Sequence, residues 1–183
     1  MKRALLAAAI LSFVATDARA GGLDKTTIAE CITSAAGAYR LPPAVLVVLL
    51  NVEGGSLGRV SQNTNDTVDI GPMQVNQIWL PQLAAHWHAS LPDTFHALRD
   101  EFCANIEAGA WILRRGLDEA HGDFWEGVGY YHSHDPEHKA TYLRAVLKQT
   151  LRLRALSERS SASREPTPAP ESVAAGRERH FNE

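Results

Sequence analysis

The stretch most informative about the fold runs from residue 43 to residue 55 and reads PAVLVVLLNVEGG. Residues 44–52 contain one polar side chain, Asn51, so the segment is apolar on every side and is predicted to be buried. This pattern alone fits either a buried strand or a buried helix. Pro43 at the start and the glycine pair at the end favour a helix, because Pro suits the first helical position and Gly suits the residue after the last turn.

Glu53 is the residue that breaks this apolar pattern, at the predicted end of the helix. A carboxyl group there is poorly solvated and lies near the negative end of the helix dipole, and both effects raise its pKa. A carboxyl that stays protonated near neutral pH can act as a general acid. From the spacing alone, Glu53 could equally turn toward solvent.

Further helices are predicted on both sides of this segment. Apolar spacing and capping signals predict helices over residues 27–39, 76–88, 102–120 and 124–131, and a last helix that Asp135-Pro136 opens. The first is expected to begin at a capping box formed by Thr27 and Glu30.

Between the predicted helices, residues 54–74 are rich in Gly, Ser, Asn, Asp and Thr, which predicts a long loop or a small irregular sheet. Loops of this length in compact domains are usually functional. The expected fold is mostly α, a single helical domain with a long active-site loop or a small irregular β region.

The whole chain of 183 residues is 45% apolar and 21% charged, which excludes a fully disordered protein. The formal net charge of −3 gives no reason to expect a nucleic-acid partner. Three parts are predicted: a signal peptide over 1–20, one domain over 21–157 and a tail over 158–183. The tail is expected to be disordered because it is rich in Ser, Pro, Glu and Arg and poor in large apolar residues.

The N-terminal segment has the features of a secretory signal peptide. Lys2 and Arg3 precede an apolar run over 4–15, and Ala18 and Ala20 occupy the two positions that signal peptidase reads. The run is too short to span a bilayer comfortably, although an uncleaved anchor is the alternative. The mature protein is therefore expected in the periplasm, starting near residue 21, with no stable membrane insertion.

Export to an oxidising compartment makes a disulfide the expected state of Cys31 and Cys103. Closing a loop of this length is worth roughly 4 kcal/mol on the chain-entropy model. Two buried free thiols are the alternative.

Four sequence patterns follow one another along the domain. They are Glu53 at a helix end, Gly71 with Met73-Gln74, the segment CANIEAGAWIL over 103–113, and Tyr131 within GYYHS over 129–133. With these patterns the chain resembles the soluble lytic transglycosylase family, which has a lysozyme-like fold. It is most similar to the branch that accompanies conjugation and secretion machines. Gly54, Pro72 and His132 replace residues that are usual in that family.

The resemblance implies cleavage of the β-1,4 bond between N-acetylmuramic acid and N-acetylglucosamine in peptidoglycan, with Glu53 as the catalytic acid and base. It implies substrate-binding roles for Met73, Gln74, Asn76, Tyr131 and His132. No cofactor or metal is implied. The expected partners are glycan strands and components of an envelope-spanning secretion or conjugation machine.

Three alternatives stay open at this stage. A hydrolase of the same fold would need a second carboxylate, for which Asp66 and Asp69 are the nearby candidates, although both fit turn residues better. A silent glycan-binding scaffold module would not need Glu53. A zinc peptidase could use the histidines over 86–88 and 132–138, but no helical His-Glu-x-x-His motif occurs.

Overall fold

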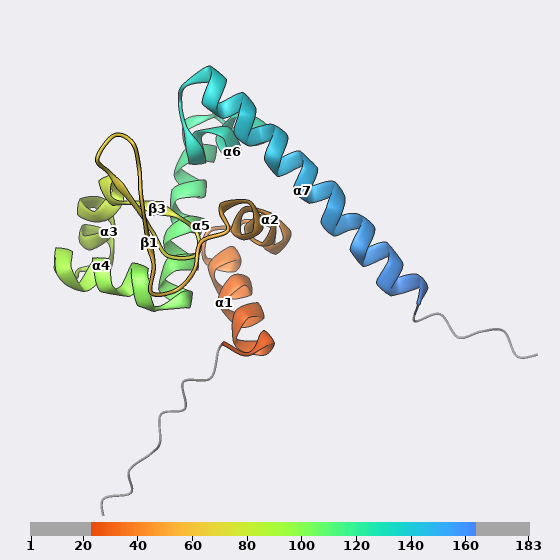
Figure 1. Ribbon diagram of the computed structural model, residues 1–183, viewed down its shortest axis with the longest axis horizontal. Helices are drawn as coiled ribbons and strands as arrows, with labels where there is room; N and C mark the ends of the chain where they lie inside the picture. Colours follow the sequence, from red (N-terminus) through yellow and green to blue (C-terminus); the bar gives the residue numbers. More distant parts are fainter. Residues whose placement is uncertain (1–22, 164–183) are drawn as a thin grey trace, which may run out of the picture.

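The computed structural model describes residues 23–163, so the predicted signal peptide and the tail beyond residue 163 lie outside the described residues. Within this range the protein folds into seven α-helices, one short 3-10 helix and a three-stranded antiparallel sheet, which confirms the mostly α fold class (Figure 1). The elements are α1 Lys25–Ala38, α2 Pro43–Glu53, β1 Val60–Gln62, β2 Val68–Ile70, β3 Val75–Asn76, η1 Gln77–Trp79, α3 Leu80–Trp87, α4 Leu91–Asp100, α5 Phe102–Glu119, α6 Phe124–His132 and α7 Pro136–Ala162.

Helix α5 runs through the middle of the fold, with α1 and α6 packed against it (Figure 1). Ten of its residues are buried, among them Ile106 and Leu113, which are fully inaccessible to solvent. Gly116 allows α6 to approach closely, since a Cβ atom there would lie 2.7 Å from the carbonyl oxygen of Gly127. The central helix α5 therefore provides the surface against which α1 and α6 pack.

The predicted disulfide is confirmed: Cys31 of α1 is bonded to Cys103 of α5, with 5.0 Å between their Cα atoms. The bond covalently joins the first helix to the central one across 72 residues of sequence. It lies on the same pair of helices that packing already brings together.

The apolar stretch over 43–53 forms α2, as Pro43 and the glycine pair predict. Leu46 and Leu49 are fully buried, because the helix packs against α1, α5 and α7. The helix ends at Gly54, which adopts a left-handed conformation with φ of 62°. An L-residue with a side chain adopts this conformation only at a cost, so Gly54 fixes where the helix stops and where Glu53 lies.

The polar segment after α2 contains the small irregular sheet, in the strand order β1-β2-β3. The register pairs Ser61 with Asp69, and Asp69 with Asn76. The turn after β2 is held by Asn105 of α5, whose fully buried amide accepts from the Met73 N–H at 2.7 Å and donates to the carbonyl oxygens of Ile70 and Leu98 at 3.0 and 2.9 Å. These three hydrogen bonds of the Asn105 side chain attach the turn after β2 and the end of α4 to α5.

Four elements differ from the sequence predictions. The helix predicted over 76–88 is divided into the end of β3, η1 and α3. Helix α1 begins earlier than the proposed capping box, because the Asp24 carboxylate accepts from the backbone N–H groups of Thr26 and Thr27. Helix α4 was not predicted, although Ser90 caps it. Helix α7 continues to Ala162, so its last turn includes the first residues assigned to the tail, with an Arg154–Glu158 ion pair spanning the predicted boundary.

Among the described residues, no single helix is long and apolar enough to cross a membrane; only α1 and α2 taken together reach that length and composition, and they are bent by 118°.

Candidate active site

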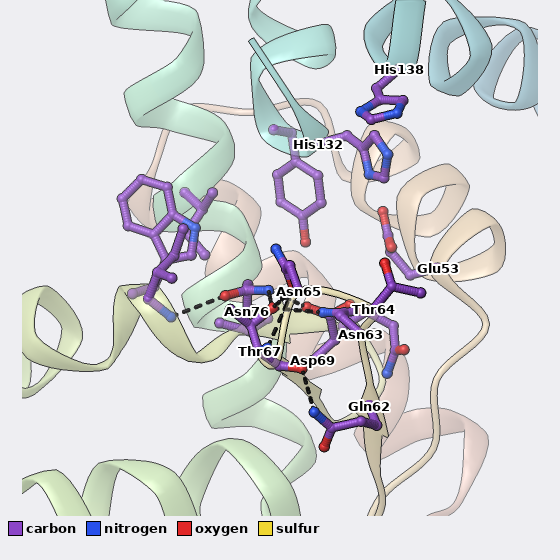
Figure 2. A pocket seen from close by; sticks show the side chains of 16 residues that line it. Glu53, Gln62, Asn63, Thr64, Asn65, Thr67, Asp69, Asn76, His132 and His138 are labelled. Atoms are coloured by element: carbon purple, nitrogen blue, oxygen red, sulfur yellow. Dashed lines mark hydrogen bonds between the residues drawn. The ribbon is translucent and has the colours of Figure 1, made fainter. Parts of the chain in front are cut away.

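A cleft of about 710 Å³ lies between the end of α2, the sheet, and the junction of α6 with α7. Five of the six predicted site residues line it: Glu53, Gln74, Asn76, Tyr131 and His132. Figure 2 shows Glu53 facing the cleft on one side, with His132 and His138 close to it and the polar side chains of the β1–β2 hairpin around the opening.

Glu53 is the last residue of α2, and its side chain is half-buried. Burial raises the pKa of Glu53 from 4.5 to about 7; the hydrogen bond from Tyr142 acts in the opposite direction, and the negative charge of Asp69 raises the pKa further. With a pKa of about 7, the Glu53 carboxyl can occur in the protonated and in the ionised form near neutral pH. A group in this state can both donate and accept a proton.

Tyr142 holds Glu53 in place, and sequence reasoning assigned it only to the apolar face of the last helix. Its hydroxyl donates to Oε1 of Glu53 at 2.6 Å, from a side chain that is 7% exposed on α7. Because Oε1 accepts this bond, the proton of the acid form is carried by Oε2. The ring of Tyr142 is also stacked on His132, with 4.6 Å between the ring centroids.

Tyr131 lines the cleft, where a substrate-binding role is expected for it. Its hydroxyl donates to the backbone carbonyl of Met73 at 3.0 Å, and it reaches neither carboxyl oxygen of Glu53 within hydrogen-bond distance. It therefore fixes the loop that carries Gln74, while Tyr142 orients the acid.

A substrate-binding role was expected for Met73, and its fully buried position contradicts that role. Its side chain is fully buried and packs against Gly109 of α5, where an added Cβ would lie 2.7 Å from Met73 Cε. The next residue, Gln74, has φ of 47°, and this left-handed turn directs neighbouring side chains to different sides. Gln74 thus lies at the cleft and Met73 in the core.

Gln74 and Asn76 line the cleft, but both amides also have partners within the protein. The Gln74 amide nitrogen donates to the Gly71 carbonyl at 2.9 Å. The Asn76 amide nitrogen donates to Thr67 and Asp69, and its oxygen accepts from the Ile78 N–H. Asn76 therefore primarily fixes the geometry of the sheet beside the cleft.

The β1–β2 hairpin supplies polar cleft residues that the sequence analysis did not single out. Five of its side chains line the cleft: Gln62, Asn63, Thr64, Asn65 and Thr67. The Thr67 hydroxyl bonds to Asn63, Asn65 and Asn76, so it ties the hairpin to β3. The polar composition of residues 54–74 was the signal that could have identified them.

The two candidate second carboxylates occupy different places. Asp69 lies in β2, lines the cleft and accepts from Asn76 at 2.8 Å. Asp66 lies in the hairpin turn with φ of 63° and is not among the cleft residues. Only Asp69 is placed where it can act on a ligand near Glu53.

The histidines do not form one cluster. His132 and His138 line the cleft, whereas His86 bonds to Tyr39 and His134 bonds to Glu119 at 2.9 Å. Burial and the neighbouring His138 lower the pKa of His132, which keeps its ring neutral beside Glu53 at neutral pH. Within residues 23–163, no three His, Cys, Asp or Glu side chains are arranged to hold a metal ion.

Comparison with known proteins finds no family model and no curated protein sequence that matches this chain. The functional assignment therefore rests on the residues and geometry of the cleft.

Proposed function

We propose that this protein is a peptidoglycan lytic transglycosylase that cleaves the β-1,4 bond between N-acetylmuramic acid and N-acetylglucosamine and leaves a 1,6-anhydro end. The observation that carries the proposal is the position of the Glu53 carboxyl at the edge of a polar cleft, oriented by a hydrogen bond from Tyr142, where burial raises its pKa to about 7.

In the first step, Oε2 of Glu53 gives its proton to the glycosidic oxygen while the bond between that oxygen and C1 of the muramoyl unit breaks. The released N-acetylglucosamine unit carries the proton as a hydroxyl group. The resulting Glu53 carboxylate is stabilised by the hydrogen bond that Tyr142 donates to Oε1.

In the second step, the C6 hydroxyl of the same muramoyl unit attacks C1 and closes the anhydro ring, and Glu53 takes up the hydroxyl proton. The enzyme returns to its starting state, and no water is consumed. A pKa of about 7 suits both steps, because one group must first donate and then accept a proton near neutral pH.

The surroundings of Glu53 fit a neutral sugar polymer. The cleft side chains are mainly amides and hydroxyls from the hairpin and β3, which can exchange hydrogen bonds with the acetamido and hydroxyl groups of amino sugars. Trp79 and Ile78 add apolar surface at the end of the cleft, where a sugar ring can pack.

A hydrolase of the lysozyme type is the second candidate, and the position of Asp69 favours it. Asp69 lines the same cleft, and its charge acts on Glu53. A hydrolase uses such a second carboxylate either to activate water or to attack C1. The products separate the two reactions, since hydrolysis leaves a reducing end and the transglycosylase reaction leaves an anhydro end.

The proposal also includes a biological setting. The leader-like residues 1–20 and the resemblance to the secretion-associated branch support a periplasmic enzyme that opens murein locally for an envelope-spanning machine.

The test is digestion of purified sacculi with residues 21–183, comparing wild type with Glu53→Gln. The amide keeps the shape of the acid but cannot donate and recover a proton, so the rate should fall by about 10⁴-fold or more. Glu30→Gln, which removes an exposed carboxyl from α1, is the matched control and should cleave like wild type. Full activity in Glu53→Gln would remove Glu53 from the mechanism, and no cleavage by wild type would favour a silent glycan-binding module.

A further inference from the structure

A second hollow of about 270 Å³ adjoins the cleft. Trp79 and Ile112 line both, so the two spaces meet over these side chains. The far part of the second hollow is formed by Arg115 and Glu119 of α5, by Tyr130 of α6 and by His134. A chain bound in the cleft can therefore extend a branch across Trp79 into this space.

Among the residues that line this hollow, Arg115 is the cation available to a ligand, beside the exposed carboxylates of Asp118 and Glu119. Its guanidinium group lies over the rings of Trp111 and Trp79, at 4.7 and 5.8 Å from their centroids. Among residues 23–163, no carboxylate lies within 4 Å of it, whereas Asp118 is paired with Arg114 and Glu119 with His134. The two indoles hold the planar cation in place without neutralising it.

The opposite wall is flat and aromatic. The rings of Tyr130 and His134 are stacked with 4.4 Å between their centroids and 13° between their planes. Lys139 lies over the Tyr130 ring at 4.8 Å from its centroid, so a planar amide group can pack against the outer face of His134 while a carboxylate reaches Arg115. The hollow thus combines a surface for peptide planes with one unpaired cation.

We infer that the second hollow binds the carboxylate-bearing peptide that branches from the muramoyl units of the strand, with Arg115 as the carboxylate partner. The inference rests on the proposed function, because it takes the ligand of the cleft to be murein. It adds that the protein distinguishes strands with peptides from bare glycan.

The test is calorimetric binding to Glu53→Gln protein, which cannot consume its ligand. Three ligands are compared: a murein tetrasaccharide with its stem peptides, the same tetrasaccharide after an amidase has removed the peptides, and a chitin tetrasaccharide. Adding Arg115→Ala should weaken binding of the first ligand about tenfold, the loss of one charge-assisted contact, and should shift the other two by less than about twofold. Arg152→Ala removes an exposed cation from α7 and is the matched control.

Equal weakening for all three ligands would make the hollow a sugar site and overturn the inference. Weakening of both murein ligands but not of chitin would assign Arg115 to the lactyl group that the two murein ligands share, and weakening of the amidase-treated ligand alone would assign it to the free lactyl carboxylate that the amidase creates. Either result, or no change at all, would overturn the inference. These outcomes are separate from the proposed function: protein that binds the peptide-bearing ligand but cleaves no sacculi contradicts the enzyme assignment alone. If the protein cleaves sacculi but Arg115→Ala leaves ligand binding unchanged, only the peptide site is contradicted.

Discussion

Replacing Glu53 by Gln should stabilise the folded protein at alkaline pH while abolishing cleavage. The ionised carboxyl is unfavourable at the buried end of α2, beside the charge of Asp69. The amide removes the charge, keeps the volume and leaves Oε1 able to accept from the Tyr142 hydroxyl. The substitution thus separates two properties of Glu53: the loss of stability that its ionisation causes and its proposed role in cleavage.

The size of the effect follows from the pKa of Glu53. A rise from 4.5 to about 7 on folding corresponds to about 3 kcal/mol. Because the folded protein holds this proton more tightly than the unfolded chain, wild-type stability falls as pH rises from 4.5 through about 7. Glu53→Gln has no carboxyl to ionise, so it escapes this loss of stability. Its free energy of unfolding should equal that of wild type at pH about 4 and exceed it by about 2–3 kcal/mol above pH about 8.

The assay is urea unfolding of both proteins across this pH range, with Glu30→Gln as the control for loss of an exposed carboxyl. The stability difference between Glu53→Gln and wild type should grow through the window from pH 4.5 to about 7. A stability difference that stays constant with pH, or a variant that is less stable than wild type at high pH, would refute the conclusion that burial raises the pKa of Glu53.

Three further predictions concern residues that position the site. Tyr142→Phe removes the bond that lowers the pKa of the catalytic carboxyl, so the alkaline limb of the kcat/KM profile should move to higher pH and the rate should fall about tenfold; an unmoved limb would contradict this. Asn105→Leu leaves three buried backbone groups without partners and should cost about 3–5 kcal/mol in urea unfolding, with a loss under about 1 kcal/mol as the contrary result. Replacing Cys31 and Cys103 together by Ser should lower the free energy of unfolding by about 4 kcal/mol, because a 72-residue loop is opened; an unchanged midpoint would show that the bond does not stabilise the fold.

The features that could be predicted from the sequence are those with a local signal. Pro43 and Gly54 mark the two ends of α2, and the intervening apolar run requires burial, so the place of Glu53 at the helix end followed, whereas the direction of its side chain did not. The disulfide followed from the expected export and from the apolar faces that carry Cys31 and Cys103.

The features that were missed depend on contacts distant in sequence or on backbone geometry. Tyr142 lies 89 residues from Glu53, and its helical spacing indicates a core residue equally well. Met73 and Gln74 are adjacent, but the positive φ of Gln74 sends their side chains to different environments. Helix α4 is an exception, because Ser90 before Pro92 and the helical spacing of Leu91, Phe95 and Leu98 are local signals from which it could have been predicted.

The most direct test of the account is digestion of sacculi in ¹⁸O-labelled water, followed by mass spectrometry of the released muropeptides. If Glu53 passes its proton to the glycosidic oxygen and the muramoyl C6 hydroxyl captures C1, the products carry 1,6-anhydro ends and no label from the solvent. Reducing ends with one solvent oxygen each would contradict that reaction and give Asp69 the role of a second catalytic carboxylate.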